Sequence, residues 1–257
     1  MGHLYQQELF KLSKRPSTWV FLGLLLLQNF GVAWLGQRYA QYTIPQENFA
    51  FNYGSTSFVV LILITACSTT ISTEFEYNTI KNLVSQADSR RAILVSKWLV
   101  MLTYSVGLYL VAMGMTLVSK LIWVGQAFGL TTTVHGGQPL WQHWVLATGT
   151  YFVTLWLLLS IVFLVAAMFK KGNIAMLVGI GGYFALSVLG KFQVLAIHKW
   201  DLVKWNPLNF LNYPEQATAV FSSRLTHLTT TELLVGNLAY TALFLGLGLY
   251  FFSRKEV

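Results

Sequence analysis

The sequence predicts an all-α integral membrane protein with six transmembrane helices and both termini in the cytoplasm. Of its 257 residues 55% are hydrophobic and only 10% are charged, whereas soluble domains carry about 25% charged residues. A soluble core cannot account for this deficit, because a core of any size still needs a polar shell. The apolar residues also fall into long runs without ionisable side chains, and Lys and Arg gather beside alternate runs.

The predicted spans are the runs long enough to cross a bilayer. A helix needs about 20 apolar residues to cross about 30 Å of hydrocarbon. The runs without Asp, Glu, Lys, Arg or His are Ser17–Gln37, Asn48–Thr73, Trp98–Ser119, Trp144–Phe169, Gly172–Gly190 and Leu233–Ser253. The first run lacks a small-residue cleavage pattern at its end, so we expect a retained helix. Together the six runs predict one membrane domain over residues 1–257.

The distribution of cations predicts the orientation. With the N-terminus inside, the cytoplasmic segments hold 11 of the 17 Lys and Arg residues: Lys11, Lys14, Arg15, Lys81, Arg90, Arg91, Lys97, Lys170, Lys171, Arg254 and Lys255. Cytoplasmic loops carry such an excess of Lys and Arg. The net charge of +8 therefore indicates anionic lipid headgroups as counterions, and we do not expect nucleic-acid binding.

Two outer segments are long enough to hold structure of their own. Thr131–His143 contains Gly136, Gly137 and Pro139, which predicts a loop. Residues 199–232 carry several aromatic side chains, namely Trp200, Trp205, Phe210 and Tyr213. Such side chains usually lie at the headgroup level, so we expect a small helical cap on the outer leaflet. A substrate gate made by these aromatics is the alternative.

Several classes of chemistry lack their usual residues. The polar side chains of the predicted spans are neutral (Gln28, Asn29, Thr103, Thr154, Ser160 and Asn237), so they offer no evident proton relay. The sequence contains no H-E-x-x-H, G-x-S-x-G or P-loop motif. His135 and His143 flank a Gly-Pro loop and favour a solvated pair over a metal site, and the single Cys67 favours a buried hydrophobe. We expect no catalytic residue, cofactor or metal in this chain.

Two cytoplasmic stretches have amphipathic patterns. In residues 1–16, Tyr5, Leu9 and Leu12 share one helical face, which predicts an interfacial helix along the inner leaflet. Between the second and third spans, a face at i, i+3, i+4 and i+7 is formed by Ile80, Leu83, Val84 and Ala87. A turn between spans needs only a few residues, so the second stretch suits docking into a partner's groove; a surface helix on the inner leaflet would look similar.

The second stretch resembles the signature of the ABC-2-type transporter permeases. The resemblance lies in Glu74, in Asn78-Thr79-Ile80-Lys81, in Leu83, in Ser89-Arg90, and in Lys97 at the start of the next span. Asn78 stands where the family often has Gly, and no Pro precedes Ser89. Asn tolerates the left-handed backbone conformation better than most residues, so a bend at position 78 survives. These departures resemble the short permeases of peptide-antibiotic immunity or export.

The resemblance implies a mechanism and its partners. Such permeases have six helices, form homo- or heterodimers, and bind separate ATP-binding-cassette ATPases that hold the ATP and Mg. Residues 74–90 would then form a coupling helix between spans two and three. The residues expected to contact the ATPase are Glu74, Glu76, Thr79, Ile80, Lys81, Leu83, Val84, Arg90 and Arg91. The implied location is a prokaryotic plasma membrane, with the chain as a multi-pass protein.

Three functions remain open from the sequence. The first is the permease subunit of an exporter for an amphipathic peptide, lipid or drug, since neutral, aromatic-rich spans suit such a cargo better than a small ion. The second is a membrane scaffold or sensor that does not transport, and whose cytoplasmic helix binds a signalling partner. The third, an intramembrane enzyme, is disfavoured because the usual catalytic groups are missing. A gene for an ATP-binding-cassette protein beside this one would favour the first.

Overall fold

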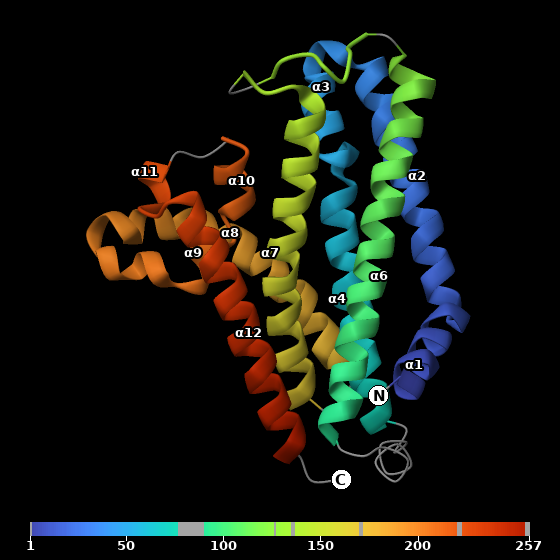
Figure 1. Cartoon of the computed structure of the whole chain (residues 1–257), viewed down its shortest axis with the longest axis vertical. Helices are drawn as coiled ribbons and strands as arrows, with labels where there is room; N and C mark the ends of the chain where they lie inside the picture. The colour runs from blue at the N-terminus through green and yellow to red at the C-terminus, as the bar shows by residue number, and fades with distance from the viewer. Residues whose placement is uncertain are drawn as a thin grey trace.

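The structure, a computed structural model, is a bundle of long helices with a small helical cap on one side (Figure 1). It describes residues 2–76, 90–125, 127–134, 137–169, 172–219 and 223–254. The side chains of 71–76, 90–91, 172–173, 191, 194 and 253–254 are not described. Within the described ranges the regular structure is helical, apart from an isolated bridge between Thr133 and Pro139. The predicted all-α class is confirmed.

The long helices follow the predicted spans closely. They are α2 (Pro16–Arg38), α4 (Ser55–Glu76), α6 (Arg90–Ser119), α7 (Leu140–Met168), α8 (Gly172–Lys199) and α12 (Thr230–Arg254). In the described part of the chain, five helices are long and apolar enough to cross a membrane, namely all of these except α8. In α8 the continuous apolar stretch is shorter, Ile174–Gly190. By length and hydropathy, five of the described helices therefore qualify as membrane spans, whereas the apolar stretch of α8 is shorter.

Shorter helices fill the connections. They are α1 (Gly2–Lys14), η1 (Ala40–Tyr42), α3 (Pro45–Ala50), η2 (Asn52–Gly54), a π-helical turn η3 (Lys120–Val124), η5 (Asp201–Trp205), α9 (Pro207–Phe210), α10 (Tyr213–Ala217) and α11 (Ser223–Thr226). The second span was predicted to begin at Asn48, but the chain turns between α3 and α4. Asn52 and Tyr53 have φ of 52° and 50°, values in the left-handed region that interrupt a helix. The span therefore begins at Ser55.

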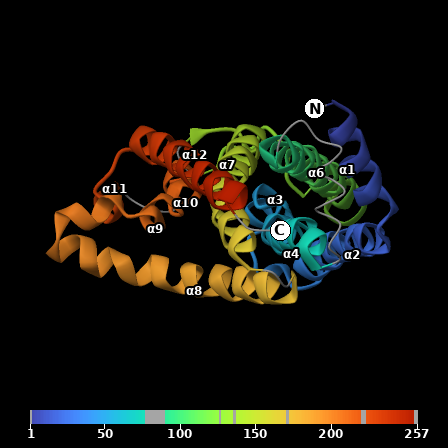
Figure 2. The same ribbon diagram turned by 90° about the horizontal axis from the view of Figure 1, so that it is seen from below.

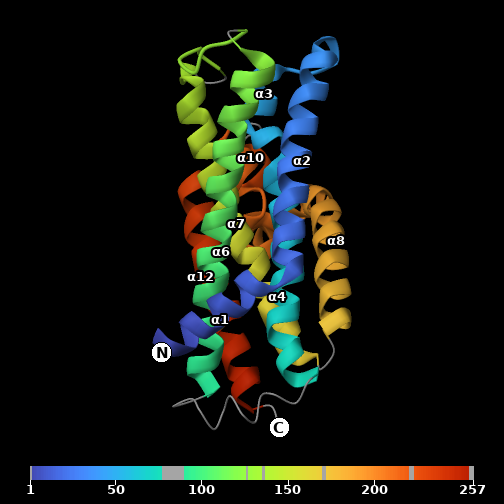
Figure 3. The ribbon, with the colours of Figure 1, turned by 90° about the vertical axis from the view of Figure 1, so that its right-hand side faces the viewer.

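One end of the bundle collects several helix termini. We call it the base, and it is formed by α1, the end of α4, the start of α6 and the end of α12 (Figures 1 and 3). The α3 helix and the loop before α7 lie at the opposite end (Figure 1). Because α4 ends at the base and α6 begins there, residues 77–89 connect two helix ends on the same side as the N-terminal helix.

The helix α8 separates from the rest of the bundle. It begins beside α4, where a Cβ on Gly179 would lie 2.8 Å from Cγ2 of Ile64, so the absence of a side chain permits the close approach. Seen from below, α8 extends lengthwise away from the other helices, whereas α7 is seen nearly end-on (Figure 2). The space between α8 and α7 is closed on its outer side by α9 and α10, which contact α7, α8 and α12.

Candidate functional site

The base is held by an ion pair between the first helix and the third span. The carboxylate Oε2 of Glu8 accepts a hydrogen bond from Nζ of Lys97 at 2.8 Å, and its Oε1 accepts one from Lys11 at 2.8 Å. Glu8 and Lys97 are buried, with Lys97 only 1% exposed, and Leu4 and Leu12 are buried on the same face of α1. The face that was predicted from Tyr5, Leu9 and Leu12 therefore packs against protein, and it includes a charged residue.

The predicted ATPase contacts fall mostly outside the described residues. Residues Thr79, Ile80, Lys81, Leu83 and Val84 all lie there. For Glu74 and Glu76 the structure describes the backbone at the end of α4, and for Arg90 and Arg91 the backbone at the start of α6, without the side chains. The coupling helix thus stays a prediction. Lys97, the last residue of the same motif, is described and takes part in the ion pair with Glu8.

A buried polar network fixes the turn before α4. Nδ2 of Asn29 donates to the carbonyl of Asn52 at 3.2 Å and to Oγ of Ser55 at 2.8 Å. Oδ1 of Asn52 accepts from Nε1 of Trp144 at 2.8 Å, and its Nδ2 donates to Oγ1 of Thr148 at 2.9 Å. A buried polar group without such partners is costly, so this network ties α2, α4 and α7 together. Of the neutral polar residues predicted in the spans, Asn29 therefore has a structural role.

The cap is attached to the long helices by amide side chains. Nε2 of Gln193 on α8 donates to Oδ1 of Asn209 at 3.1 Å, and Nδ2 of Asn209 donates to the carbonyl of Thr226 at 2.8 Å. On α12, Nδ2 of Asn237 donates to the carbonyl of Phe210 at 2.8 Å. These bonds anchor α9 between α8 and α12. The cap therefore has a defined position against the spans.

The aromatic residues of the cap fall into two groups. Trp200 is 59% exposed and Trp205 47% exposed, as expected for side chains at a headgroup level. In contrast, Phe210 and Tyr213 are buried in a cluster with Leu157 and Leu233, so the predicted anchoring role is wrong for these two. Phe210 fits against the backbone of Gly236, where a Cβ would lie 2.0 Å from the ring.

The exposed rim of the cap carries an ionic cluster. Asp201 accepts a hydrogen bond from Nζ of Lys204 at 2.7 Å, and its other oxygen lies 3.1 Å from Nδ1 of His227. These two hydrogen bonds hold the pKa of the Asp201 carboxyl below its usual range. The Asp201 side chain is exposed, so the cluster contributes little to stability.

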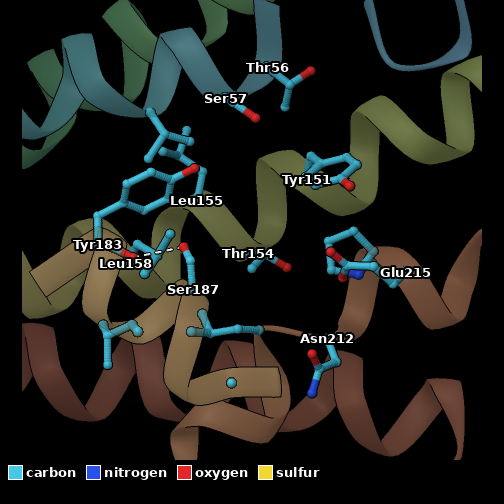
Figure 4. Close-up of a pocket in the computed structure, with 15 residues that line it drawn as sticks. Thr56, Ser57, Tyr151, Thr154, Leu155, Leu158, Tyr183, Ser187, Asn212 and Glu215 are labelled. Carbon is cyan, nitrogen blue, oxygen red and sulfur yellow. Dashed lines mark hydrogen bonds between the residues drawn. The ribbon is translucent and has the colours of Figure 1, made fainter. Parts of the chain in front are cut away.

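A cavity of about 370 Å³ lies between α4, α7, α8 and the cap (Figure 4). Its polar lining residues come from four elements, and they are Thr56, Ser57, Tyr151, Thr154, Tyr183, Ser187, Asn212 and Glu215. Leu155, Leu158 and Leu186 supply the main apolar surface. Ser57 on α4 and Tyr183 on α8 both line the cavity, from facing walls. The cavity wall is mainly apolar with several polar groups, and it lies beside the middle of α7.

Glu215 gives this cavity a negative charge. Pro214 begins α10 after Asn212, and Glu215 follows in the first helical turn, where the carboxylate points into the cavity beside Tyr151 (Figure 4). Its charge acts electrostatically on the phenols of Tyr151 and Tyr183. The fifteen lining residues include no Lys, Arg or His. The lining therefore combines a carboxyl group with hydroxyl groups and apolar side chains.

The surroundings of Glu8 and Glu215 were not predicted from the sequence. Glu8 was read as part of a surface helix and Glu215 as part of an outer cap, and each meets its surroundings through contacts distant in sequence. A weak signal exists for Glu8, which is spaced four residues from both Leu4 and Leu12 and so lies on their face. For Glu215, the Pro214-Glu215 pair predicts the start of a helix but not its position beside the spans.

Comparison with known proteins settles the family. The chain matches the sequence profile described as ABC-2 family transporter protein over residues 4–198. The chain belongs to the ABC-2 transporter family. The match runs from α1 through α8 and so includes the parts of the base formed by α1, α4 and α6 and the three cavity walls formed by α4, α7 and α8. A comparison with curated proteins gives no match.

Membership of the ABC-2 family fixes the general role of the chain. It is a multi-pass membrane protein and a permease component of an ABC transporter. Permeases of this family lack a nucleotide-binding domain of their own, and the family implies partnership with an ABC ATPase and often dimerisation. The prediction made from Glu74–Lys97 is thereby confirmed at the level of the family.

Proposed function

We propose that this chain is the membrane-spanning subunit of an ABC exporter that moves an amphipathic peptide, lipid or drug outward. A separate ATPase subunit binds the ATP and Mg, and a second permease copy or a paralogue completes the pathway. The family match supports the permease role. The cavity between α4, α7 and α8 supports an amphipathic cargo, because it offers a mainly apolar wall and several polar groups to the same molecule.

The arrangement of the base supports coupling to an ATPase on that side. Residues 77–89 connect α4 to α6 there. The Glu8–Lys97 ion pair holds α1 to α6 at the same end of the bundle. In this proposal the apolar residues Ile80, Leu83 and Val84 seat in the ATPase groove, while Glu74, Glu76, Thr79, Lys81, Arg90 and Arg91 set the register. Closure of the ATPases then moves α4 and α6 together. Since α4 lines the cavity, that movement changes access to it.

In this proposal the chain lies in the plasma membrane of a prokaryote, with the base in the cytoplasm and the cap outside. The Lys and Arg bias of the sequence supports it. The location of α1, of the start of α6 and of the end of α12 at one end of the bundle agrees with an even number of crossings (Figure 1).

The proposal is tested with inside-out vesicles that contain the chain and its ATPase. A fluorescent amphipathic dye is added outside, and ATP-dependent accumulation is measured. We expect accumulation with the wild-type chain and its loss in Val84→Asp, while ATP hydrolysis continues, because a charge on the apolar face weakens docking. Full transport by Val84→Asp would contradict the coupling assignment. Failure of dyes, lipids and peptides alike to move with the wild-type chain would contradict export.

A further inference from the structure

We propose that the N-terminal helix α1 is a second coupling element, which ties the two helices that flank residues 77–89 to the first span, α2. Movement imposed by the ATPase on α4 and α6 then reaches α2 as well. The inference rests on the proposed function and adds to it the residues that transmit the movement. It depends on three sets of contacts at the base: those of α1 with α6, of Arg15 with α4, and of α1 with α2.

The first set of contacts fixes α1 to the start of α6. The ion pair between Glu8 and Lys97 is buried, and the Tyr5 hydroxyl lies 2.8 Å from Oγ1 of Thr103. Two contacts at different positions along both helices oppose rotation of one helix against the other. Separation of α1 from α6 would break the buried pair, which is costly. The helix α1 therefore follows α6 when α6 moves (Figure 3).

The second set fixes the end of α1 to α4. Arg15 lies between the last residue of α1 and the first residue of α2. Its Nη1 donates to Oγ1 of Thr69 at 3.4 Å and to Oγ1 of Thr70 at 3.5 Å, and both threonines belong to the last part of α4. A guanidinium is planar and always charged, so it can bridge two neighbouring hydroxyl groups. Both helices that residues 77–89 connect are thus attached to α1, α6 through Glu8 and α4 through Arg15.

The third set fixes the corner between α1 and α2. Oγ1 of Thr18 donates to the carbonyl of Leu12 at 2.7 Å, and Nε1 of Trp19 donates to the carbonyl of Ser13 at 2.8 Å. The last carbonyl groups of a helix have no partner within it, and here two of them bond to the first turn of the next helix. Pro16 begins α2 with a fixed φ. The corner therefore holds one angle, and a tilt of α1 tilts α2.

The packing of α2 makes this corner important for its position. Only 17% of the residues in its apolar stretch are buried, against 67% for the second span. Farther along α2, Asn29 attaches the helix to the turn before α4 through Asn52 and Ser55. A helix that is held at Asn29 and displaced at Pro16 tilts about the held point. The contacts of α1 at the base therefore determine how far α2 tilts.

The test measures the movement of α2 directly, without a transported substrate. The complex of the chain with its ATPase is placed in phosphatidylcholine nanodiscs, in a Cys67→Ala background, with the labelled chain diluted so that each complex holds one labelled copy. Spin labels are attached at exposed positions, Leu27→Cys on α2 or Leu110→Cys on α6, each paired with Leu238→Cys on α12. Distances are measured by double electron–electron resonance without nucleotide and after trapping with ATP and vanadate. We expect trapping to shift both distances in the wild type.

Matched variants separate the two movements. The corner variant Thr18→Val/Trp19→Phe and the variant Arg15→Gln should each reduce the α2 shift by about half or more, since changes along a coupling network alter it by such factors. In the corner variant the α6 shift should stay as in the wild type. Lys14→Gln is the control, because it removes the same charge one position earlier, where the ammonium contacts the Phe10 ring on α1 itself; both shifts should persist.

The outcomes distinguish this proposal from the proposed function. An α2 shift that is unchanged in both variants would overturn the role of α1, and so would an equal loss of both shifts in the corner variant, which indicates general damage. An α6 shift without an α2 shift in the wild type would overturn this proposal alone. Absence of an α6 shift in the wild type would contradict the proposed coupling, and this proposal with it. Should the corner variant not fold, Arg15→Gln against Lys14→Gln decides the question.

Discussion

Glu8 and Lys97 lie 89 positions apart in the sequence, and their side chains meet at the base with 2.8 Å between Oε2 and Nζ. The pair joins the N-terminal helix to the span that follows the proposed coupling segment. Tyr5 adds a second contact between the same two helices, because its hydroxyl lies 2.8 Å from Oγ1 of Thr103. The N-terminal helix is therefore part of the bundle and moves with α6.

Removal of either charge should destabilise the base. Breaking a buried ion pair by removing one partner costs about 3–5 kcal/mol, whereas replacing both partners by neutral groups costs much less. We expect Glu8→Gln and Lys97→Met each to lower the unfolding temperature in detergent, and the double variant to recover much of the loss. Lys11→Met is the control, because Lys11 is partly exposed and surface pairs contribute about 0–1 kcal/mol. Additive effects of the two single changes would contradict the direct pairing.

The turn before α4 should depend on both the backbone and the side chain of Asn52. Asn52→Ala removes the hydrogen bonds to Trp144 and Thr148 and puts at a φ of 52° a residue that tolerates the left-handed conformation less well than Asn. Asn52→Gly removes the same bonds but adopts this conformation without strain. We expect Gly to be less destabilising than Ala by about 1 kcal/mol, measured by chemical unfolding followed by circular dichroism. If Ala were the milder change, the left-handed turn would not be a feature of the protein.

The fit of Phe210 against Gly236 should control how stably the cap packs on α12. Gly→Ala in a helix usually stabilises a protein by roughly 0.5–1 kcal/mol, but a Cβ at Gly236 would overlap the Phe210 ring. We expect Gly236→Ala to lower the unfolding temperature in detergent, because the Phe210 ring must move to admit the added methyl group. Phe210→Leu should partly rescue it.

The control for this change lies on the same helix. A Cβ on Gly246 would meet nothing within 4 Å, so Gly246→Ala should leave stability unchanged or slightly improved. Equal losses from Gly236→Ala and Gly246→Ala would show that helix α12 tolerates no added methyl group, and would contradict a specific contact with Phe210.

Hydropathy predicted the long helices well because each span is a local property of about 20 residues. The runs Ser17–Gln37 and Trp144–Phe169 differ from α2 and α7 only at their ends. Prediction failed where contacts distant in sequence decide the structure. The turn at Asn52 is held by Asn29 and Trp144, neither of which a local window includes.

The two candidate sites differ in the same way, because one was predicted from a local motif and the other is formed by residues distant in sequence. The ATPase-coupling residues were named from a local motif, and the family match confirms the family that this motif indicated. The cavity was not predicted, because its lining residues come from four elements between Thr56 and Glu215. Glu215 in particular belongs to a short helix, α10, whose packing against α7 and α12 has no local signature. Its neighbours in sequence predict only a short helix.

The central claim, that an ATPase docks on the segment between α4 and α6, is tested most directly by purifying the tagged chain from its native membranes in mild detergent. Co-eluting proteins are identified and quantified by mass spectrometry for the wild type, for Leu83→Asp, and for the control Thr131→Asp, which adds the same charge to an exposed position at the opposite end. We predict an ABC ATPase in stoichiometric amount with the wild type and with Thr131→Asp, and its loss with Leu83→Asp. An ATPase retained in full by Leu83→Asp, or absent from every preparation of the wild type, would contradict the claim.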